Sequence, residues 1–413
     1  MMPPGLTWST SRLLLFRFFV VWVVLLTITI PFHYHFLPST GNWITGVSEW
    51  MVRYSARIFV GTAHYEQQLL SDSTGFYVHM FNMLMLALVA SFAWTFFYPR
   101  IRTHRQLQYW FTVYVRYFLA LLLLIYGFPK VFKAQFYLPE PNILYTPMGQ
   151  LYPDILYWSS MGVSRSYSMF LGCAEVIAAL LLFFRRTAMM GAIGALFILL
   201  NVLAINLAYD IAVKMLTTFL IILCIYLLLT EARRIILFTS GNAVTASALW
   251  KPLWTGKTKL IIGSIKIIVI LALIYESVFP YVKSNNFNDD KAPRPYLHGA
   301  WSVKTFITGN DTLPPLLTDN TRWRRVFFHR QGYFIVQKMD DSMLDYKMKM
   351  DRVNKRIQIT TDTGFDTLLF DHPNEHSLLI QTMHPPVIKV VLEKIDWEKL
   401  PALQKEFSWT LDR

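Results

Sequence analysis

Seven long apolar runs constrain the fold of this sequence more than any other feature. A helix needs about 20 mostly apolar residues to cross the hydrocarbon core of a bilayer. Runs of that length lie at residues 12–31, 76–98, 108–131, 167–184, 188–209, 212–231 and 259–281. With 54% hydrophobic and only 16% charged residues, the chain is also too apolar for an ordinary soluble protein. We therefore predict an all-α membrane bundle of about seven transmembrane helices. The first run is expected to be a span and not a signal peptide, since no small-residue cleavage site follows it.

Basic residues in the short loops predict the orientation, because Lys and Arg beside a span stay preferentially in the cytoplasm. With a cytoplasmic N-terminus, the cytoplasmic segments contain Arg12, Arg100, Arg102, Arg105, Arg185, Arg186, Arg233, Arg234, Lys251, Lys257 and Lys259. The opposite loops have fewer, chiefly Arg53, Arg57, Lys133 and Arg165. Seven spans then place the chain from about residue 285 outside the cytoplasm. The expected location is the bacterial cytoplasmic (inner) membrane, with a periplasmic C-terminal domain.

These loop clusters account for much of the net charge of +13, so no nucleic-acid partner is predicted. The only cysteines, Cys173 and Cys224, lie within predicted spans. The external part therefore has no disulfide framework, and each cysteine is expected to be a small core residue.

The C-terminal segment has a different period from the spans. The polar stretch "PYVKSNNFNDDKAPRPYLHGAWSV" is typical of a linker. After it, "VFFHRQGYFIVQKM", "YKMKMDRVNKRIQIT" and "DTLLFDHPNEHSLLIQ" show short alternating runs separated by turn residues. We predict a small β-rich domain over residues 285–413, either a sandwich or a barrel. The Gly-x-Trp of "HGAWSVKTF" is similar to the first strand of lipocalin-like barrels.

Two segments between spans are rich in aromatic residues. Residues 43–70 place apolar side chains at helical spacing and predict an external helix at the membrane interface, with Ile44, Val47, Trp50, Met51 and Tyr54 on it. The Pro-rich loop 132–166 is expected to cap the outer mouth of the bundle.

Ionisable residues inside spans are the candidates for chemistry, because each is costly there unless it is paired or faces water. They are His79, Arg116, Lys130, Glu175, Asp210, Lys214, Lys266 and Glu276. Arg116 lies about 12 Å into its span and Glu175 is near the midplane of the next, so we predict that they pair. Such a pair either holds the bundle in register or forms a site for a polar or anionic group beside an apolar slot.

A second polar group is expected toward the outer face. Asn206, Asp210 and Lys214 recur at steps of four and share a stripe if helix persists through residues 209–212, and Lys130 ends its span at similar height. Together they predict a polar pocket that opens outward. Lys266 and Glu276 are expected at the membrane interface, and His79 is expected to be a hydrogen-bonded core histidine.

Other signals are weaker. His33 and His35 could face one ligand, but no third ligand is identifiable, so no metal site is predicted. The basic, aromatic "TRWRRVFFHR" is expected to be a solvated strand face. The sequence has no Gly-rich phosphate loop, nucleophile elbow, HExxH or paired CxxC.

The arginine, glycine and lysine of "RYFLALLLLIYGFPK", which are Arg116, Gly127 and Lys130, resemble the first helix of the DoxX-like membrane family. The stretch "LGCAEVIAALLLF", with Glu175, is similar to the next helix of that family. The resemblance covers residues 108–232 and departs from the usual pattern at Tyr126, where a histidine often stands, and at Pro129. It implies a compact four-helix unit, flanked here by N-terminal spans (1–107), a cytoplasmic loop with the last span (233–284) and the external domain.

The resemblance also implies two classes of function. Some relatives are membrane subunits of a thiosulfate:quinone oxidoreductase, so the bundle is expected to bind a quinone or lipid, with Glu175 relaying protons and Arg116 stabilising the charged partner. Quinone is the only cofactor expected, and an electron-donating subunit is required, because the sequence has no flavin, haem or iron–sulfur motif. Alternatively, the protein is a non-catalytic scaffold, assembly factor or transporter whose β domain binds an external protein or lipid.

Overall fold

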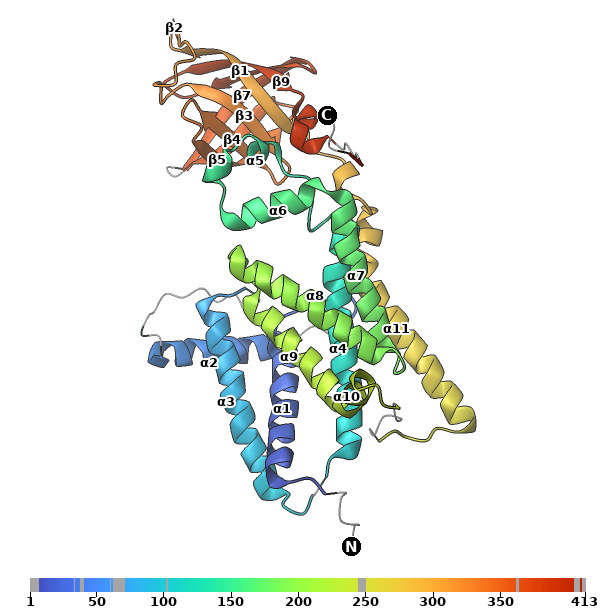
Figure 1. The fold of residues 1–413 in the computed structure, drawn as a ribbon. Helices are drawn as coiled ribbons and strands as arrows, with labels where there is room; N and C mark the ends of the chain where they lie inside the picture. The colour runs from blue at the N-terminus through green and yellow to red at the C-terminus, as the bar shows by residue number, and fades with distance from the viewer. Residues whose placement is uncertain are drawn as a thin grey trace. The chain divides into compact units, whose positions relative to one another are not determined.

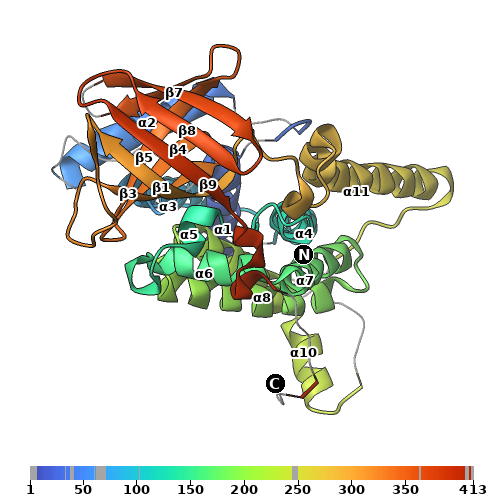
Figure 2. The same cartoon turned by 90° about the horizontal axis from the view of Figure 1, so that it is seen from above.

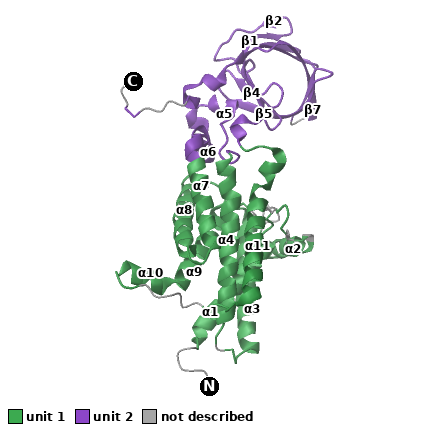
Figure 3. Ribbon diagram, turned by 90° about the vertical axis from the view of Figure 1, so that its right-hand side faces the viewer, with its two compact units in different colours: residues 1–132, 169–287 green, residues 133–168, 288–413 purple. Residues whose placement is uncertain are grey.

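The computed structural model describes residues 7–32, 34–37, 41–59, 61, 71–101, 103–243, 250–361, 364–404 and 409–410. His33, Arg102 and residues 62–70 of the predicted interfacial segment lie outside these ranges. The chain divides into two compact units (Figure 3). We call residues 1–132 and 169–287 the helical unit, and residues 133–168 and 288–413 the barrel unit. The prediction assigned residues 133–166 to the four-helix part, whereas their contacts group them with the barrel.

The helical unit is built from long apolar helices (Figure 1). They are α1 (Thr10–Thr29), α2 (Asn42–Phe59), α3 (Thr74–Phe97), α4 (Arg105–Val131), α7 (Arg165–Phe183), α8 (Ala188–Ala208), α9 (Lys214–Thr230), α10 (Ala232–Thr239) and α11 (Gly256–Ser284). Six of the described helices are long and apolar enough to cross a membrane. A seventh span results if α9 and α10, which are bent by 71° to one another, count as one. A multi-pass helical membrane part is therefore confirmed.

Local signals set several helix boundaries. The Ser9 side chain accepts a hydrogen bond from the Arg12 backbone N–H at 3.3 Å, and Ser73 accepts one from Phe76 at 3.2 Å. Each serine satisfies a backbone N–H at the first turn of its helix, α1 or α3, which would otherwise lack a partner. These two helices pack along each other (Figure 1).

The exposed side of α2 agrees with the predicted interfacial helix. Its exposed large apolar side chains follow one stripe: Trp43, Val47, Trp50, Tyr54 and Ile58. Spacings of three and four residues place them on one helix face. The helix is confirmed for residues 42–59, and three residues of the predicted stripe, Val47, Trp50 and Tyr54, lie on its exposed face. Ile44 and Met51 are half-buried. The location of the helix at a membrane interface stays a prediction.

The helices α4 and α7 approach closely at a pair of glycines. A Cβ atom added at Gly172 would lie 2.6 Å from the carbonyl oxygen of Gly127 and 2.7 Å from the backbone nitrogen of Val131. Small residues allow such backbone contact between membrane helices. Residue 172 therefore has to be glycine for these helices to cross at this distance.

We expect Gly172→Ala to destabilise the helical unit by about 1–3 kcal/mol, because the added methyl group meets backbone atoms that cannot rotate away. Gly194→Ala is the matched control: it makes the same change on α8, where the nearest atom is the Ala178 Cβ at 3.9 Å. Unfolding of the full chain in mixed micelles, followed by circular dichroism, measures both. Equal stability of the two variants would contradict the tight crossing.

The barrel unit contains a closed antiparallel sheet. Its strands are β1 (Gly299–Thr308), β2 (Asp311–Thr312), β3 (Trp323–His329), β4 (Tyr333–Lys338), β5 (Met343–Asp351), β6 (Arg356–Thr361), β7 (Gly364–Asn374), β8 (Ser377–Thr382) and β9 (Ile388–Ile395). Strands β3 to β9 pair consecutively, and β1 pairs with both β3 and β9, which closes the ring. Figure 2 shows the strands side by side, and Figure 3 shows the ring end-on. The sequence left a sandwich or a barrel open, and the structure is a barrel.

Apolar side chains fill the inside of this barrel. Trp301 of the predicted Gly-x-Trp is 1% exposed, and its indole N–H donates to the Leu297 carbonyl oxygen at 3.1 Å. The core around it contains Val303, Phe306, Val326, Phe328, Phe334, Val336, Ile357, Ile359, Leu368, Phe370, Leu378, Ile380, Val390 and Leu392. Barrels of about eight strands are just wide enough for side chains to fill. The interior is thus a packed core.

A second, smaller core lies on the outer face of the sheet. Phe327 and Ile335 pack there with Trp397, and Leu144 and Tyr145 of the 133–168 segment join them. This segment carries the short helix α5 (Pro141–Leu144) and α6 (Pro153–Val163). The barrel and the aromatic loop therefore form one unit, and the loop supplies part of the site described below.

Candidate functional site

Lys130 and Glu175 form a buried ion pair in the helical unit. The Lys130 ammonium lies 2.9 Å from the Glu175 carboxylate and also donates to the Tyr126 carbonyl oxygen at 2.9 Å. The two residues are 6% and 4% exposed. A Cβ at Gly127 would lie 3.2 Å from that of Glu175, so the glycine admits the glutamate beside α4. Lys130 reaches back by one turn, as long helical side chains do.

The predicted Arg116–Glu175 pair is therefore wrong. The Arg116 guanidinium donates from Nε and Nη2 to the Leu182 carbonyl oxygen, at 2.8 and 2.6 Å. Leu182 is in the last turn of α7, where carbonyl groups have no partner within the helix and attract cations. That turn contains no basic residue of its own. Arg116 is buried because it caps the end of a neighbouring helix.

The stripe predicted for residues 206–214 is also interrupted. Helix α8 ends at Ala208, and Asp210 adopts a left-handed conformation with φ 52°. Lys214 still contacts the exposed Asp210 carboxylate at 2.8 Å, and its backbone N–H donates to Asp72 at 2.7 Å. Asp72 therefore caps α9.

Asn206 and Lys130 do not share this arrangement. The Asn206 side chain donates to the Thr217 hydroxyl at 3.1 Å inside the bundle, and Lys130 pairs with Glu175. The candidates thus serve separate structural contacts, and the structure does not gather them into one outward pocket.

Three other predicted residues have identifiable places. Glu276, expected at the interface, is 3% exposed and accepts backbone N–H groups of residues 36 and 37 at 2.8 and 3.1 Å. The carboxylate anchors this loop, and its location at the membrane interface stays a prediction. His79 is fully buried and lies 2.9 Å from the Thr29 hydroxyl, as expected of a core histidine. The Lys266 ammonium lies 4.7 Å from the centre of the Phe184 ring. Among the described residues, no group of three potential metal ligands occurs.

Arg116 also lines a small pocket at one end of the helical unit. This arginine pocket has a volume of about 40 Å³ and is lined by Tyr109, Thr112, Val113, Arg116, Arg185, Ala188, Met189, Ala192, Leu227, Thr230, Glu231 and Arg234. Three arginines and one glutamate give its lining an excess of positive charge. Sequence analysis assigned Arg185 and Arg234 only to topology and predicted a pair with Glu175 for Arg116.

A larger pocket lies in the barrel unit. This aromatic pocket has a volume of about 420 Å³ and is lined by Gln135, Tyr137, Pro139, Glu140, Ile143, Asp154, Ile155, Trp158, Ser159 and His329. Most of these residues come from the 133–168 segment, and His329 ends β3. The pocket has the size and the mixture of apolar walls and few polar groups that are typical of small-molecule sites.

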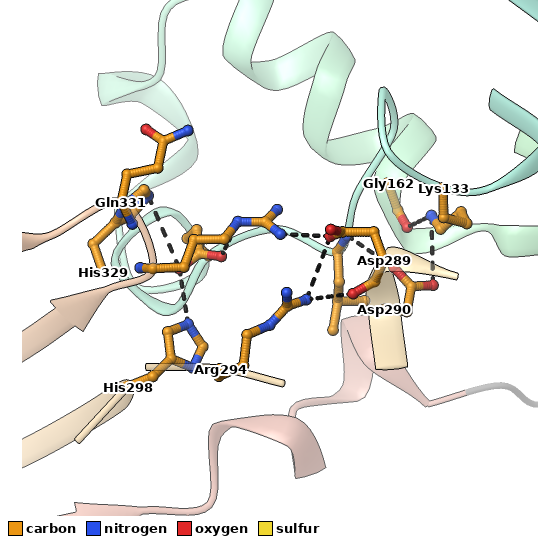
Figure 4. A network of polar contacts seen from close by, with 11 residues as sticks. Lys133, Gly162, Asp289, Asp290, Arg294, His298, His329 and Gln331 are labelled. Carbon is orange, nitrogen blue, oxygen red and sulfur yellow. Dashed lines mark hydrogen bonds and ion pairs between the residues drawn. The ribbon is translucent and has the colours of Figure 1, made fainter. Parts of the chain in front are cut away.

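Glu140 links this pocket to a buried polar network, of which Figure 4 labels His298, His329 and Asp289. Its carboxylate lies 2.9 Å from His298 Nε2 and 3.0 Å from Arg330 Nε. His329 Nε2 is 3.9 Å away, and Arg330 continues to Asp289. Arg294 bonds the Asp289 carbonyl oxygen at 2.8 Å. The network ties the loop before β1, the β3–β4 turn and the N-terminus of α5 together.

The network sets the ionisation of its members. Burial alone would raise the pKa of Glu140, but the hydrogen bond from His298 and the charges of His298, His329 and Arg330 outweigh it and lower that pKa below its usual 4.5. Burial lowers the pKa of His329 below its usual 6.5. Glu140 is therefore a carboxylate at neutral pH, where Arg330 supplies a positive charge beside it. His329 is neutral there and adds its positive charge only when it is protonated in acid.

No local sequence pattern marks this site. Gln135, Glu140 and Asp154 show no metal or catalytic spacing. The partners of Glu140 are more than 140 residues farther along the chain. The only usable sign was the aromatic and Pro-rich character of residues 132–166.

Comparison with known proteins gives one relative. Over 128 residues, the chain is 36% identical to the uncharacterized protein YwoB of Bacillus subtilis (strain 168), which corresponds to 29% of this chain and 75% of that protein. No protein-family profile and no solved structure matches the chain.

Proposed function

This chain belongs to the family of YwoB, and from its geometry we propose that it is a membrane-anchored binding protein whose barrel unit takes a small ammonium compound into the aromatic pocket. The main observation behind this proposal is a buried hydrogen-bond acceptor in the pocket lining for which no donor is described. The Oε1 atom of Gln135 is buried and has no hydrogen-bond partner among the described residues, although buried polar atoms almost always have one. It belongs to a residue that lines the pocket, so the O–H or N–H donor of a ligand would satisfy it.

The charges of the pocket favour a cation. Glu140 is already balanced by Arg330 and His298, as described above. Asp154 has no ion-pair partner among the described residues, and it lines the same pocket. Its position in the first turn of α6 also has a structural benefit, since an acidic group stabilises a helix N-terminus. The pocket lining and the Gln135 acceptor favour a ligand role as well.

The aromatic side chains of the pocket also favour an ammonium group. Trp158 is half-buried in the pocket, and indole is the strongest side-chain partner for an ammonium group. The Tyr137 ring is less suitable, because the Arg330 guanidinium already lies 3.8 Å from its centre. The proposed ligand therefore places its ammonium group between Trp158 and Asp154.

Calorimetry on the full-length protein in detergent tests this proposal with choline and its uncharged isostere 3,3-dimethylbutan-1-ol. Choline is expected to bind and the isostere is not. Asp154→Asn is expected to weaken choline binding about tenfold, since it removes an attraction between two opposite charges that is about 1–4 kcal/mol near a protein surface. Asp311→Asn, an exposed change elsewhere in the barrel unit, is the control. Equal binding of both compounds, no saturable binding, or unchanged affinity in Asp154→Asn would each refute the proposal.

A second candidate function is that of a DoxX-like membrane subunit that binds a quinone. The buried Glu175 carboxylate favours it, because a carboxylate held by one lysine can exchange a proton with a bound redox partner. Gentle extraction followed by mass spectrometry decides it: one quinone per chain supports this role, and its absence together with choline binding supports the first proposal.

We further propose that the N-terminus is cytoplasmic and the barrel unit is periplasmic, on the basis of the basic loops. A reporter that is active only outside the cytoplasm should work when fused after residue 413 and fail when inserted beside Arg100. The opposite reporter pattern would contradict this topology and would mean that one of the seven predicted spans does not cross the membrane.

A further inference from the structure

The arginine pocket of the helical unit carries a separate inference: the geometry points to a binding site for a phosphate group, supplied by an anionic phospholipid. Three elements converge on it. Arg116 comes from α4, Arg185 from the turn between α7 and α8, and Arg234 from α10. Guanidinium groups bind phosphate through parallel N–H bonds, and their fixed fork makes them the preferred residues for it.

The hydrogen bonds within the pocket leave donor capacity for a ligand. Arg116 uses Nε and Nη2 on the Leu182 carbonyl oxygen, and its Nη1 takes part in no described hydrogen bond. Arg234 donates from Nη1 to Glu231 at 3.2 Å, whereas its Nε is buried and has no partner in the described part of the chain. Each guanidinium has five N–H donors. Two arginines thus retain unused N–H groups at one small pocket.

The charge balance points to an anion. Glu231 is the only acidic residue in the lining, against three arginines. Positive side chains held together at a partly buried site repel one another unless an anion joins them. Topology alone accounts for arginines near this end of the helices, but it does not require Arg234 Nε to be buried without a partner.

The surroundings favour a lipid as the source of the phosphate. The bend of 71° between α9 and α10 lies at the pocket, and the apolar side chains of Leu229, Ile236 and Phe238 beside it are 62–70% exposed. An amphipathic helix of this kind lies in the membrane interface. A cavity needs a volume of roughly 10–15 Å³ to hold one water molecule. The arginine pocket, at about 40 Å³, therefore admits a small oxyanion. The acyl chains would then lie along the exposed apolar surface.

Native mass spectrometry of the full-length protein with added phosphatidylglycerol tests this inference. One lipid is expected to stay bound to the natural protein, and Arg234→Gln should reduce its retention about tenfold. Arg233→Gln is the control, because it removes the same charge from the neighbouring, exposed residue of α10, which does not line the pocket. Equal melting temperatures of the two variants establish that both are folded. Arg234 is preferred to Arg116, whose loss would also uncap α7.

Competition distinguishes the sources of the phosphate. If millimolar inorganic phosphate leaves the lipid in place, the site takes a phospholipid. If phosphate displaces it and binds to the natural protein but not to Arg234→Gln, the pocket is an anion site for a soluble phosphate and the lipid assignment is overturned. Equal lipid retention by Arg234→Gln and Arg233→Gln would overturn the site itself. None of these outcomes depends on choline binding in the barrel unit.

Discussion

Replacing Glu175 by leucine is expected to destabilise the helical unit by about 3–5 kcal/mol, because it leaves the Lys130 ammonium buried without its counter-ion. Lys130→Met should have a similar effect for the converse reason. The double variant should recover most of the loss, since both charges and their desolvation are removed together. Unfolding of the full chain in mixed micelles measures all three.

The decisive control uses Arg116, the partner that the sequence suggested. Arg116→Leu combined with Glu175→Leu should give additive losses, because the arginine contacts Leu182 and not the glutamate. Recovery in that double variant, or additivity in the Lys130 pair, would contradict the structure. If the Lys130→Met/Glu175→Leu protein folds but no longer supports quinone retention, the pair belongs to a site and not only to the packing.

The spans and the β domain were predictable because solvent sets their pattern. A bilayer demands long apolar helices, and a half-buried strand demands alternation, so both leave periods that can be read without coordinates. In β6, for example, Ile357 and Ile359 point inward between exposed neighbours. The closure of β1 on β9 pairs residues about 90 positions apart, such as Ala300 with Ile395, and no local pattern encodes that register.

The polar partners were not predictable, for a different reason. Depth along a span predicts which residues lie at similar height, but not which helix faces adjoin. The crossing at Gly127 and Gly172 decides that Glu175 meets Lys130. Arg116 donates to a backbone carbonyl group. Every residue has such a group, so no sequence motif marks this partner. The aromatic pocket likewise depends on a long-range contact, because His329 lies beside the segment around residue 140.

Glu140→Gln is expected to destabilise the barrel unit by about 3 kcal/mol. The amide keeps the shape of the side chain but removes the charge that Arg330 and His298 face at 3.0 and 2.9 Å, and Glu140 is only 4% exposed. Glu393→Gln is the control, since it makes the same change in an exposed pair with Lys304. Exposed pairs contribute about 0–1 kcal/mol. Hydrogen exchange of peptides from β1 and β3 in the full-length protein measures the local free energy of opening.

The pH dependence separates the charge of Glu140 from its packing. Because the folded-state pKa of Glu140 is lowered, its stabilisation is fully present above the usual value of 4.5 and is lost as the pH falls through the lower, folded value. The lowered pKa of His329 adds an earlier loss, starting as the pH falls through 6.5, since the unfolded state binds that proton first. The free energy of opening, obtained from exchange rates corrected for their intrinsic pH dependence, should therefore fall in two stages when the natural protein is acidified. Glu140→Gln should lack the more acidic stage, and if it retained both, another carboxylate would have to hold the network together.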